Sequence, residues 1–352
     1  MKRTRPSCKW LTALTLAFSL LLALGGCSAK AAQRHEKQLF AMDTVMFLTA
    51  YGSKGEAALT AAADIINALA ADLDPETPGS SVYAMNAGAG TAVSVSEDCY
   101  AVLERAAAAA QLTDGALDIT LYPIIKAWGF TTGDYRVPEQ AELDGLLAAK
   151  DMDAFRMDGA ARTVTLPEGV EVSLGAIAKG YAAQKAVDAM ADMGVKHAIL
   201  SLGGNVQTLG DTRPDGKRWQ VAVTDPRDPE AYAGVLSVGQ TAVVTSGGYQ
   251  RYFQQDGKTY IHILDPATGC PVDNDLLSVT VVTANGAVAD ELSTALFVMG
   301  SEGALDLYDW ANDTVGGFEL VLITKDDRVI VTAGLAGSFT ETTDGYTYEY
   351  LE

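Results

Sequence analysis

The chain has 352 residues, of which 45 are acidic and 25 are basic, so its formal charge is −20 at pH 7. Such an acidic balance excludes a nucleic-acid-binding protein, because the neutralisation of phosphates requires a basic face. It also means that an anionic ligand would need local positive charge or a metal ion in its site.

The N-terminus has the pattern of a secretory signal peptide, with a basic stretch followed by an apolar run. This run is too short, and too soon followed by polar sequence, to indicate a membrane span. It ends in LGGC, where Cys27 resembles the lipid-accepting cysteine of a bacterial lipobox; the alternative is an ordinary signal peptide with a chance cysteine. We expect a signal peptide over residues 1–26, a lipidated tether over 27–37, and a lipid-anchored protein on the extracytoplasmic face of the cell membrane.

The remaining chain, residues 38–352, shows no linker or internal repeat, so we expect one large domain, as a single body or as two lobes. Helical patterns are clear at residues 55–73, 96–112, 138–150 and 178–194. The third opens with Pro138 at a plausible first helical position, and the fourth closes on Gly194.

Strand-like runs occur at residues 197–204, 219–224, 276–283, 318–324 and 328–334. Several of them follow one another with little chain in between. Short connections of this kind favour antiparallel pairing, so the expected fold is α+β, with a mostly antiparallel sheet and flanking helices, rather than a doubly wound sheet.

Two polar positions in the first half of the domain are candidates for a site. Asp118 has apolar neighbours, and a buried carboxylate needs a partner, so it either caps a structural element or accepts an N–H from a ligand. Gly175 interrupts a strand-like run just before a helix, whose start favours anions. Lys179 lies in the first turn of that helix, where a cation opposes the helix dipole; it is either a ligand-binding residue or a solvated lysine in a packing turn.

The second half adds a glycine pair and a histidine. Gly203 and Gly204 end an apolar run, where they make either a plain turn or a close approach for a ligand, but the pattern is not GxGxxG and implies no dinucleotide fold. His262 is one of three histidines in the chain and stands in YIHILDPATG, just before a strong turn signal.

Asp290 and Thr294 are four residues apart in a helix-like segment, which places a carboxylate and a hydroxyl on one helical face. Both are hard oxygen donors that suit Mg²⁺; the alternative is an acid near the helix start and a surface threonine. Cys99 and Cys270 can pair outside the cell, which the sequence alone does not decide. The chain has no CxxC and no Cys/His cluster, so a zinc site is not expected.

Several segments, taken in order, closely resemble the ApbE family of FAD:protein FMN transferases: MDT, ALDITLYPIIKAWGF, SLGAIAKGYAAQ, LGGN, TSGGYQRYF, YIHILDPATGCPV and ADELSTALFVMG. The resemblance covers nearly all of the chain after the tether. It implies an α+β flavin-binding fold and Mg²⁺-dependent transfer of FMN from FAD to a Thr or Ser hydroxyl of an acceptor protein, with release of AMP. Family analogy points to acceptor flavoproteins of extracytoplasmic electron-transfer systems.

The resemblance also implies roles for individual residues. The metal would be held by Asp290, Thr294 and the backbone carbonyl of Ala176, and His262 would be the general base. A base that titrates near neutral pH suits the deprotonation of an attacking hydroxyl. Mg²⁺ and a lysine would supply the local positive charge that the acidic chain otherwise lacks. Contacts with FAD are implied for Met42, Ala116, Leu117, Asp118, Ser173, Lys179 and Ile263.

The chain departs from the family pattern at two positions. Ser173 stands where the family usually has Asp, so it can hydrogen-bond the flavin but brings no negative charge. Glu76 stands where the family often has Tyr, so stacking on a ring is not expected there. Two other functions fit the same residues: hydrolysis of FAD to FMN and AMP, with water as the acceptor, and FAD binding without turnover, which has no use for a base such as His262.

Overall fold

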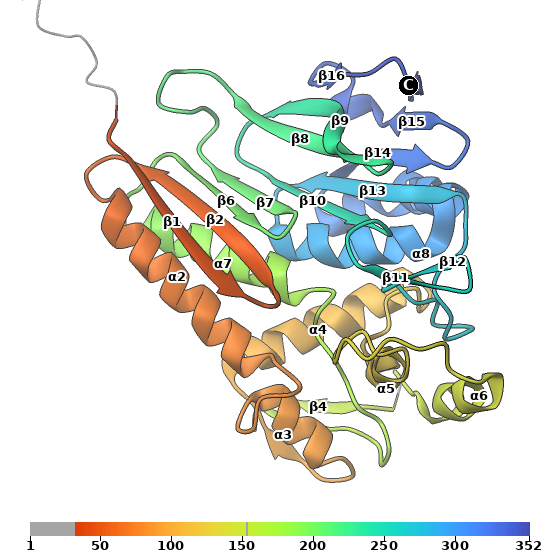
Figure 1. Ribbon diagram of the computed structural model, residues 1–352. Helices are drawn as coiled ribbons and strands as arrows, with labels where there is room; N and C mark the ends of the chain where they lie inside the picture. Colours follow the sequence, from red (N-terminus) through yellow and green to blue (C-terminus); the bar gives the residue numbers. More distant parts are fainter. Residues whose placement is uncertain (1–31, 153) are drawn as a thin grey trace, which may run out of the picture.

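The computed structural model describes residues 32–152 and 154–352. Its centre is a nine-stranded sheet with the order β1-β2-β6-β7-β10-β13-β14-β15-β17 (Figure 1). All neighbours are antiparallel except β15 and β17, which confirms the expected α+β fold with a mostly antiparallel sheet. The strands are β1 Arg34–Ala41, β2 Thr44–Tyr51, β6 Ala198–Leu202, β7 Asn205–Leu209, β10 Ala242–Gly247, β13 Leu276–Thr283, β14 Phe318–Thr324, β15 Arg328–Val331 and β17 Thr347–Tyr350.

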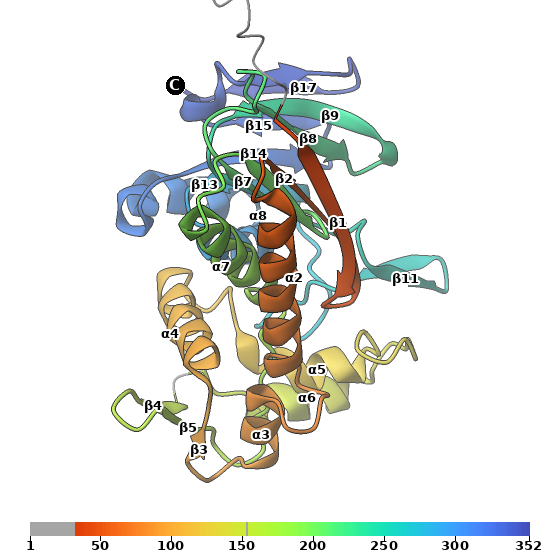
Figure 2. The same ribbon diagram turned by 90° about the vertical axis from the view of Figure 1, so that its left-hand side faces the viewer.

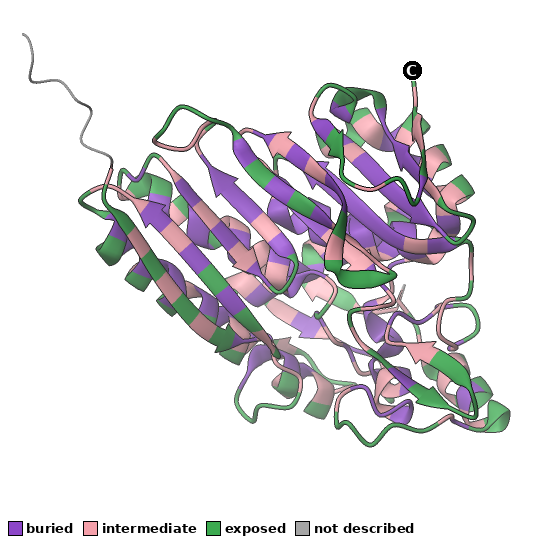
Figure 3. Ribbon diagram, turned by 45° about the horizontal axis from the view of Figure 1, so that its top comes forward, coloured by how far each residue is buried: buried purple, intermediate pink, exposed green. Residues whose placement is uncertain are grey.

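Helices cover one face of this sheet and a second, smaller sheet covers the other (Figures 1 and 2). The helices on the first face are α2 Gly55–Asp72, α7 Ala178–Asp192 and α8 Gly286–Ala311. The small sheet has the order β16-β9-β8, formed by β8 Trp219–Asp225, β9 Asp228–Val238 and β16 Phe339–Glu341. The layers explain why the central strands are buried on both sides, as Figure 3 shows.

Alternate residues of the central strands belong to two different cores. Val279 and Val281 of β13 pack towards α8, whereas Val282 packs towards the small sheet. The same alternation holds in β14, where Leu320 faces α8 and Val321 faces the small sheet. This alternation is the period of two that a strand between two layers requires.

The remaining elements lie beyond one end of the large sheet, below it in Figure 1. They are the helices α3 Ser81–Ala87, α4 Glu97–Leu112, α5 Tyr122–Ala127 and α6 Gln140–Ala149 and the three-stranded sheet of β3 Val93–Ser94, β5 Thr163–Thr165 and β4 Arg156–Asp158. A separate hairpin, β11 Tyr252–Gln255 and β12 Lys258–Ile261, packs on α5 and α6 through an aromatic cluster. Short 3₁₀ turns occupy Ile119–Leu121, Asn312–Val315 and Ala333–Leu335.

The structure corrects three expectations about elements. Residues 34–37, assigned to the tether, belong to β1, which pairs along its whole length with β2. The third helix begins at Gln140, with Glu139 at the N-cap, so Pro138 lies before it. The run before Gly175 is extended but is not a strand, because the Asn86 side chain makes the two backbone hydrogen bonds to Val172 that a neighbouring strand would otherwise make.

The signal segment 1–26 and the lipidation site Cys27 lie outside the described residues. In the part of the chain that is described, none of the helices has both the length and the apolar character needed to span a bilayer. Cys99 and Cys270 are both free cysteines, the first buried in the first turn of α4 and the second half-buried near α6.

Candidate active site

A cavity of about 610 Å³ lies where the β1–β2 turn, the start of α7, the first turns of α8 and the segment after β12 meet. This volume is within the range of small-molecule sites. All of the residues that the sequence singled out for FAD, metal or catalysis line this cavity, although their roles stay predictions. They are Met42, Ala116, Leu117, Asp118, Ser173, Ala176, Lys179, His262, Ile263, Asp290 and Thr294.

Two glycines bring α7 and α8 into close contact beside the cavity. A Cβ atom on Gly180 would lie 2.1 Å from the carbonyl oxygen of Gly286 and 2.5 Å from the Cβ of Asp290, so no side chain fits there. The backbone N–H of Gly180 donates a 2.7 Å hydrogen bond to Oδ2 of Asp290. The contact therefore fixes one carboxylate oxygen of Asp290 at the positive end of α7.

The carboxylate of Asp290 has the properties of a metal ligand. Asp290 is 3 % exposed, and no ion pair among the described residues involves it. A buried charge without an ion-pair partner is costly, and a bound cation removes that cost. Thr294 lies one helical turn further along and contributes a hydroxyl to the same cavity, as Ala176 contributes backbone.

This set of donors fits Mg²⁺ better than a softer metal. Mg²⁺ takes hard oxygen ligands, commonly one or two carboxylates, and leaves further positions to water and substrate phosphates. Within the described residues there is no group of three or more His, Cys, Asp or Glu side chains that would hold a metal without such help. An ion bound at Asp290 would therefore depend on Thr294, backbone oxygen and the substrate.

The start of α7 supplies positive charge to the cavity. The ammonium of Lys179 is 3.2 Å from the carbonyl oxygen of Gly175 and belongs to no ion pair of the described chain. Ser173 adds a hydroxyl, whose oxygen accepts a 3.4 Å hydrogen bond from the N–H of Gly175. An uncompensated lysine near the N-terminus of a helix is suited to a phosphate group.

Asp118 has the structural capping role that was one of the two alternatives for it. Its Oδ1 accepts hydrogen bonds from the N–H of Thr120 at 2.8 Å and from its hydroxyl at 2.6 Å, so it caps the 3₁₀ turn that follows. Its Oδ2 is 3.0 Å from the ammonium of Lys150, which neutralises the buried carboxylate. The contact with FAD implied for residues 116–118 stays a prediction, and Lys150 is a partner that the sequence did not reveal.

Two hairpin turns with left-handed backbone form one side of the cavity. Met42 and Asp43 join β1 to β2 with φ values of 49° and 59°, and Gly203 and Gly204 join β6 to β7 with φ values of 61° and 100°. Two positive φ values in a two-residue loop are typical of type I′ hairpins. Glycine adopts them freely, whereas Met42 and Asp43 do so at a cost of about 1 kcal/mol or more each. Thr44 lies against Gly203, where any Cβ would collide with it.

His262 follows directly after β12 rather than lying in the strand. Its backbone N–H and its Nδ1 both lie 3.1 Å from the carbonyl oxygen of Arg251. Because a carbonyl oxygen only accepts, Nδ1 carries the proton and Nε2 keeps its lone pair. The imidazole is further held edge-on to the ring of Phe130, with centroids 6.4 Å apart.

The environment of His262 favours its neutral form. Burial lowers the pKa of His262 to about 4, and the positive charges of Lys179 and Arg251 act in the same direction, against the hydrogen bond to the Arg251 carbonyl. At neutral pH the side chain is therefore an uncharged proton acceptor.

The cavity also contains aromatic and acidic groups near its outer parts. Glu76 lines it, and its carboxylate accepts a hydrogen bond from the hydroxyl of Tyr122. This position thus offers a carboxylate rather than a ring, as expected from the sequence. Phe40 of β1 also lines the cavity and is 69 % exposed, so it is an available aromatic surface that the sequence analysis missed.

The polar residues at the end of β10 belong to the TSGGYQRYF segment, whose individual residues were given no role from the sequence. Ser246 lies 2.8 Å from the hydroxyl of Ser293 and 3.5 Å from that of Thr294, so it positions the hydroxyl face of α8. Thr245 and Arg251 line the same cavity.

Comparison with known proteins agrees with this arrangement. The model of the ApbE family matches residues 42–317. A FAD:protein FMN transferase of Treponema pallidum (strain Nichols) is 32 % identical over 336 residues, which are 90 % of this chain and 92 % of that protein. One from Klebsiella pneumoniae (strain 342) is 34 % identical over 256 residues, 72 % of this chain and 78 % of that protein.

The fold has a counterpart among solved structures. The crystal structure of the ApbE protein from Thermotoga maritima superposes with a TM-score of 0.77 and 29 % identity, over 88 % of this chain and 97 % of that one. The family match covers most of the chain, and both the sequence relatives and the fold agree with it. The protein therefore belongs to the ApbE family.

Proposed function

We propose that this protein is an FAD:protein FMN transferase that moves FMN from FAD to a Thr or Ser hydroxyl of an acceptor flavoprotein, in a Mg²⁺-dependent reaction that releases AMP. The curated relatives carry the name of this activity. One observation supports it most directly: a single cavity combines a neutral histidine with a buried carboxylate and a lysine that form no ion pair within the described residues. An FAD store without turnover needs no such base.

The chain's own residues have separable tasks in this reaction. Lys179 and the N-terminus of α7 would bind the pyrophosphate, and Asp290, Thr294 and Ala176 would hold the metal. Bound Mg²⁺ would stabilise the charge on the phosphoryl oxygens as the phosphoanhydride breaks. Nε2 of His262 would accept the proton of the acceptor hydroxyl while its oxygen bonds to the phosphorus of the FMN part and the bond to AMP breaks.

The N-terminal sequence supports a site of action outside the cytoplasm. A lipid on Cys27 would hold the protein at the extracytoplasmic face of the cell membrane, where acceptor flavoproteins of electron-transfer systems reside. We propose this placement on the basis of the basic n-region, the apolar run and the LGGC sequence.

The test combines the protein with FAD, Mg²⁺ and a recombinant FMN-binding domain of an ion-pumping oxidoreductase subunit. Flavin fluorescence on the acceptor band of a denaturing gel is the expected result. The label should disappear with EDTA and with an acceptor whose target Thr is replaced by Val. Free FMN without a labelled acceptor would instead identify an FAD hydrolase, and unchanged FAD would identify a binding protein.

A further inference from the structure

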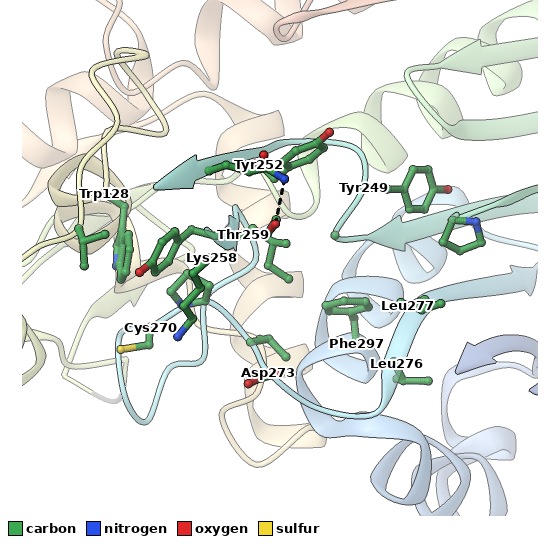
Figure 4. Close-up of a pocket in the computed structure, with 18 of the residues that line it drawn as sticks. Trp128, Tyr249, Tyr252, Lys258, Thr259, Cys270, Asp273, Leu276, Leu277 and Phe297 are labelled. Atoms are coloured by element: carbon green, nitrogen blue, oxygen red, sulfur yellow. Dashed lines mark hydrogen bonds between the residues drawn. The ribbon is translucent and has the colours of Figure 1, made fainter. Parts of the chain in front are cut away.

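A second, larger hollow of about 830 Å³ lies beside the β11–β12 hairpin (Figure 4). It is lined by aromatic and aliphatic side chains, among them Tyr249, Tyr252 and Phe297, and it is bounded by the turn between β8 and β9. The two spaces adjoin at the end of β12, because Ile261 lines this groove and the next residue, His262, lines the FAD cavity. A chain lying in the groove would thus end beside the general base.

The open edge of β12 faces this groove. The hairpin is a sheet of only two strands, so each strand has one unpaired edge. All four residues of β12 line the groove, although alternate side chains of a strand point to opposite faces. The groove therefore runs along the edge of the strand and not only along one face.

The register of the hairpin shows which backbone groups are free on that edge. In an antiparallel ladder, residue pairs that exchange hydrogen bonds alternate with pairs that do not. The backbone N–H of His262 donates to the carbonyl oxygen of Arg251, so these two residues form a hydrogen-bonded pair. Tyr260, two residues earlier in the chain, therefore also belongs to a hydrogen-bonded pair. Thr259 and Ile261 belong to the non-hydrogen-bonded pairs, so their N–H and C=O groups point away from β11.

The hairpin is held firmly enough to act as a template. The ring of Tyr260 stacks on Phe253 with centroids 5.1 Å apart, and its centroid lies 5.4 Å from that of Trp128. Phe253 in turn stacks on Tyr135 at 5.1 Å. An edge fixed by such packing loses little freedom when another strand pairs with it.

The charge of the groove is opposite to that of the whole chain. Arg227, Lys258 and Lys325 line it, with Asp273 as the single carboxylate. Lys325 is paired with Asp273 at 2.9 Å, and Arg227 is paired with Asp327. Lys258 makes no ion pair within the described residues and lies over the ring of Tyr260. It can therefore bind an acidic group of a partner.

We infer that an extended, acidic segment of the acceptor protein docks in this groove as an additional strand on the edge of β12. Main-chain hydrogen bonds to Thr259 and Ile261 align the segment, and the apolar groove takes its alternate side chains, as in other cases of strand addition. The acceptor hydroxyl then lies at the His262 end, and an acidic side chain about four residues away meets Lys258. This inference rests on the proposed transferase function.

The main-chain part is tested by Thr259→Pro with Thr259→Ala as its matched control. Proline removes the outward N–H without disturbing the pairing with β11, and alanine removes the same side chain but keeps that N–H. With the oxidoreductase domain as the acceptor, we expect Thr259→Pro to raise the acceptor KM roughly tenfold. Thr259→Ala should leave the acceptor KM unchanged, and neither variant should change the affinity for FAD.

The electrostatic part is tested by Lys258→Glu, with Lys196→Glu as a control of equal charge change on an exposed loop before β6. Lys258→Glu should raise the acceptor KM roughly tenfold at low salt and much less at 0.5 M salt, since salt screens exposed charges. Wild-type acceptor KM values in both Thr259→Pro and Lys258→Glu would overturn the docking site. A wild-type protein that labels no acceptor would instead overturn the transferase function itself, and the docking site with it.

Discussion

At the scale of single residues, His262 combines a fixed tautomer with an unusually low pKa. The Arg251 carbonyl holds the proton on Nδ1, and burial lowers the pKa to about 4. The neutral form is the active base, so activity is present above this pKa and is lost as the pH falls through it. We expect the acidic limb of kcat/KM, which reports the free enzyme, to lie near pH 4 rather than near the ordinary value of about 6.5.

The acidic limb of the kcat profile should lie at a higher pH than that of the kcat/KM profile. The negative pyrophosphate of bound FAD favours the imidazolium form of His262 and so raises its pKa in the complex. His262→Ala should lose this limb together with roughly 10²–10⁴ of the rate, while FAD binding stays the same. The measurement is a pH profile of FMN transfer for both proteins, with FAD affinity measured separately. A variant that keeps the saturated rate and binds FAD weakly would show that His262 is a binding residue.

Asp290 is the residue on which metal binding should depend. Asp290→Asn keeps an oxygen for the N–H of Gly180 and removes the charge. Loss of a residue that only orients a ligand typically costs 10–100-fold in metal affinity, so we expect loss of this direct ligand to cost about 100-fold or more. Calorimetric titration of Mg²⁺ in the presence of FAD measures this.

The unfolding temperature of Asp290→Asn should not fall, because the substitution removes an unpaired buried charge. This separates a lost ligand from a damaged fold. Wild-type Mg²⁺ affinity in a folded Asp290→Asn protein would place the metal elsewhere.

At the scale of elements, the crossing of α7 and α8 depends on the absence of a side chain at Gly180. An alanine Cβ would meet backbone oxygen at 2.1 Å, which forces the helices apart. We expect Gly180→Ala to destabilise the protein by about 1–3 kcal/mol despite the better helix propensity of alanine. It should also weaken Mg²⁺ binding, since Asp290 is oriented from this contact.

Gly145 in α6 is the matched control for this substitution, because a Cβ there meets no atom within 4 Å. Gly145→Ala should stabilise the protein by up to about 1 kcal/mol, the ordinary gain for a helix interior. Urea unfolding of both variants gives the comparison. Equal effects of the two substitutions would mean that the helices are free to adjust at Gly180.

The elements that the sequence predicted well are those whose own residues show the full alternation or periodicity of apolar positions that the element needs. The strand at residues 276–283 agrees with β13, and the helical segment 55–73 agrees with α2. β1 was missed in part because it is an edge strand, with four of its eight residues exposed and a polar sequence. The extended segment before α7 was misread because Asn86, far away in sequence, takes the place of a neighbouring strand.

At the scale of the whole molecule, the candidate site is assembled from segments spread along most of the chain. Their common location was expected from the family resemblance, because short motifs with a fixed order imply a known arrangement. Partners made only by tertiary folding, such as Lys150 beside Asp118, carry no local signal. The groove beside β12 likewise has no local signal in the sequence, because β12, the β8–β9 turn and the start of β13 meet only in the folded chain.

The position of Cys27 sets how the whole molecule would meet the membrane. Cys27 precedes the first residue of β1, Arg34, by seven positions, and an extended chain of that length spans at most about 25 Å. The lipid would therefore keep the catalytic body close to membrane-bound acceptors. Without the four basic residues of segment 1–26, 21 basic residues remain against 45 acidic ones, so the body itself is repelled by anionic lipid.

Cys27→Ala should consequently move the protein from the membrane to the soluble fraction, because the acidic body that remains is repelled by anionic lipid. Fractionation of cells after a carbonate wash measures this. Transfer of FMN to the soluble acceptor domain should be unchanged, since Cys27 lies outside the body that carries the cavity, whereas labelling of acceptors in the membrane should fall. A Cys27→Ala protein that stays with the washed membranes would show that the anchor is a different segment, and an equal loss of activity on the soluble acceptor would show that the substitution harms the enzyme itself.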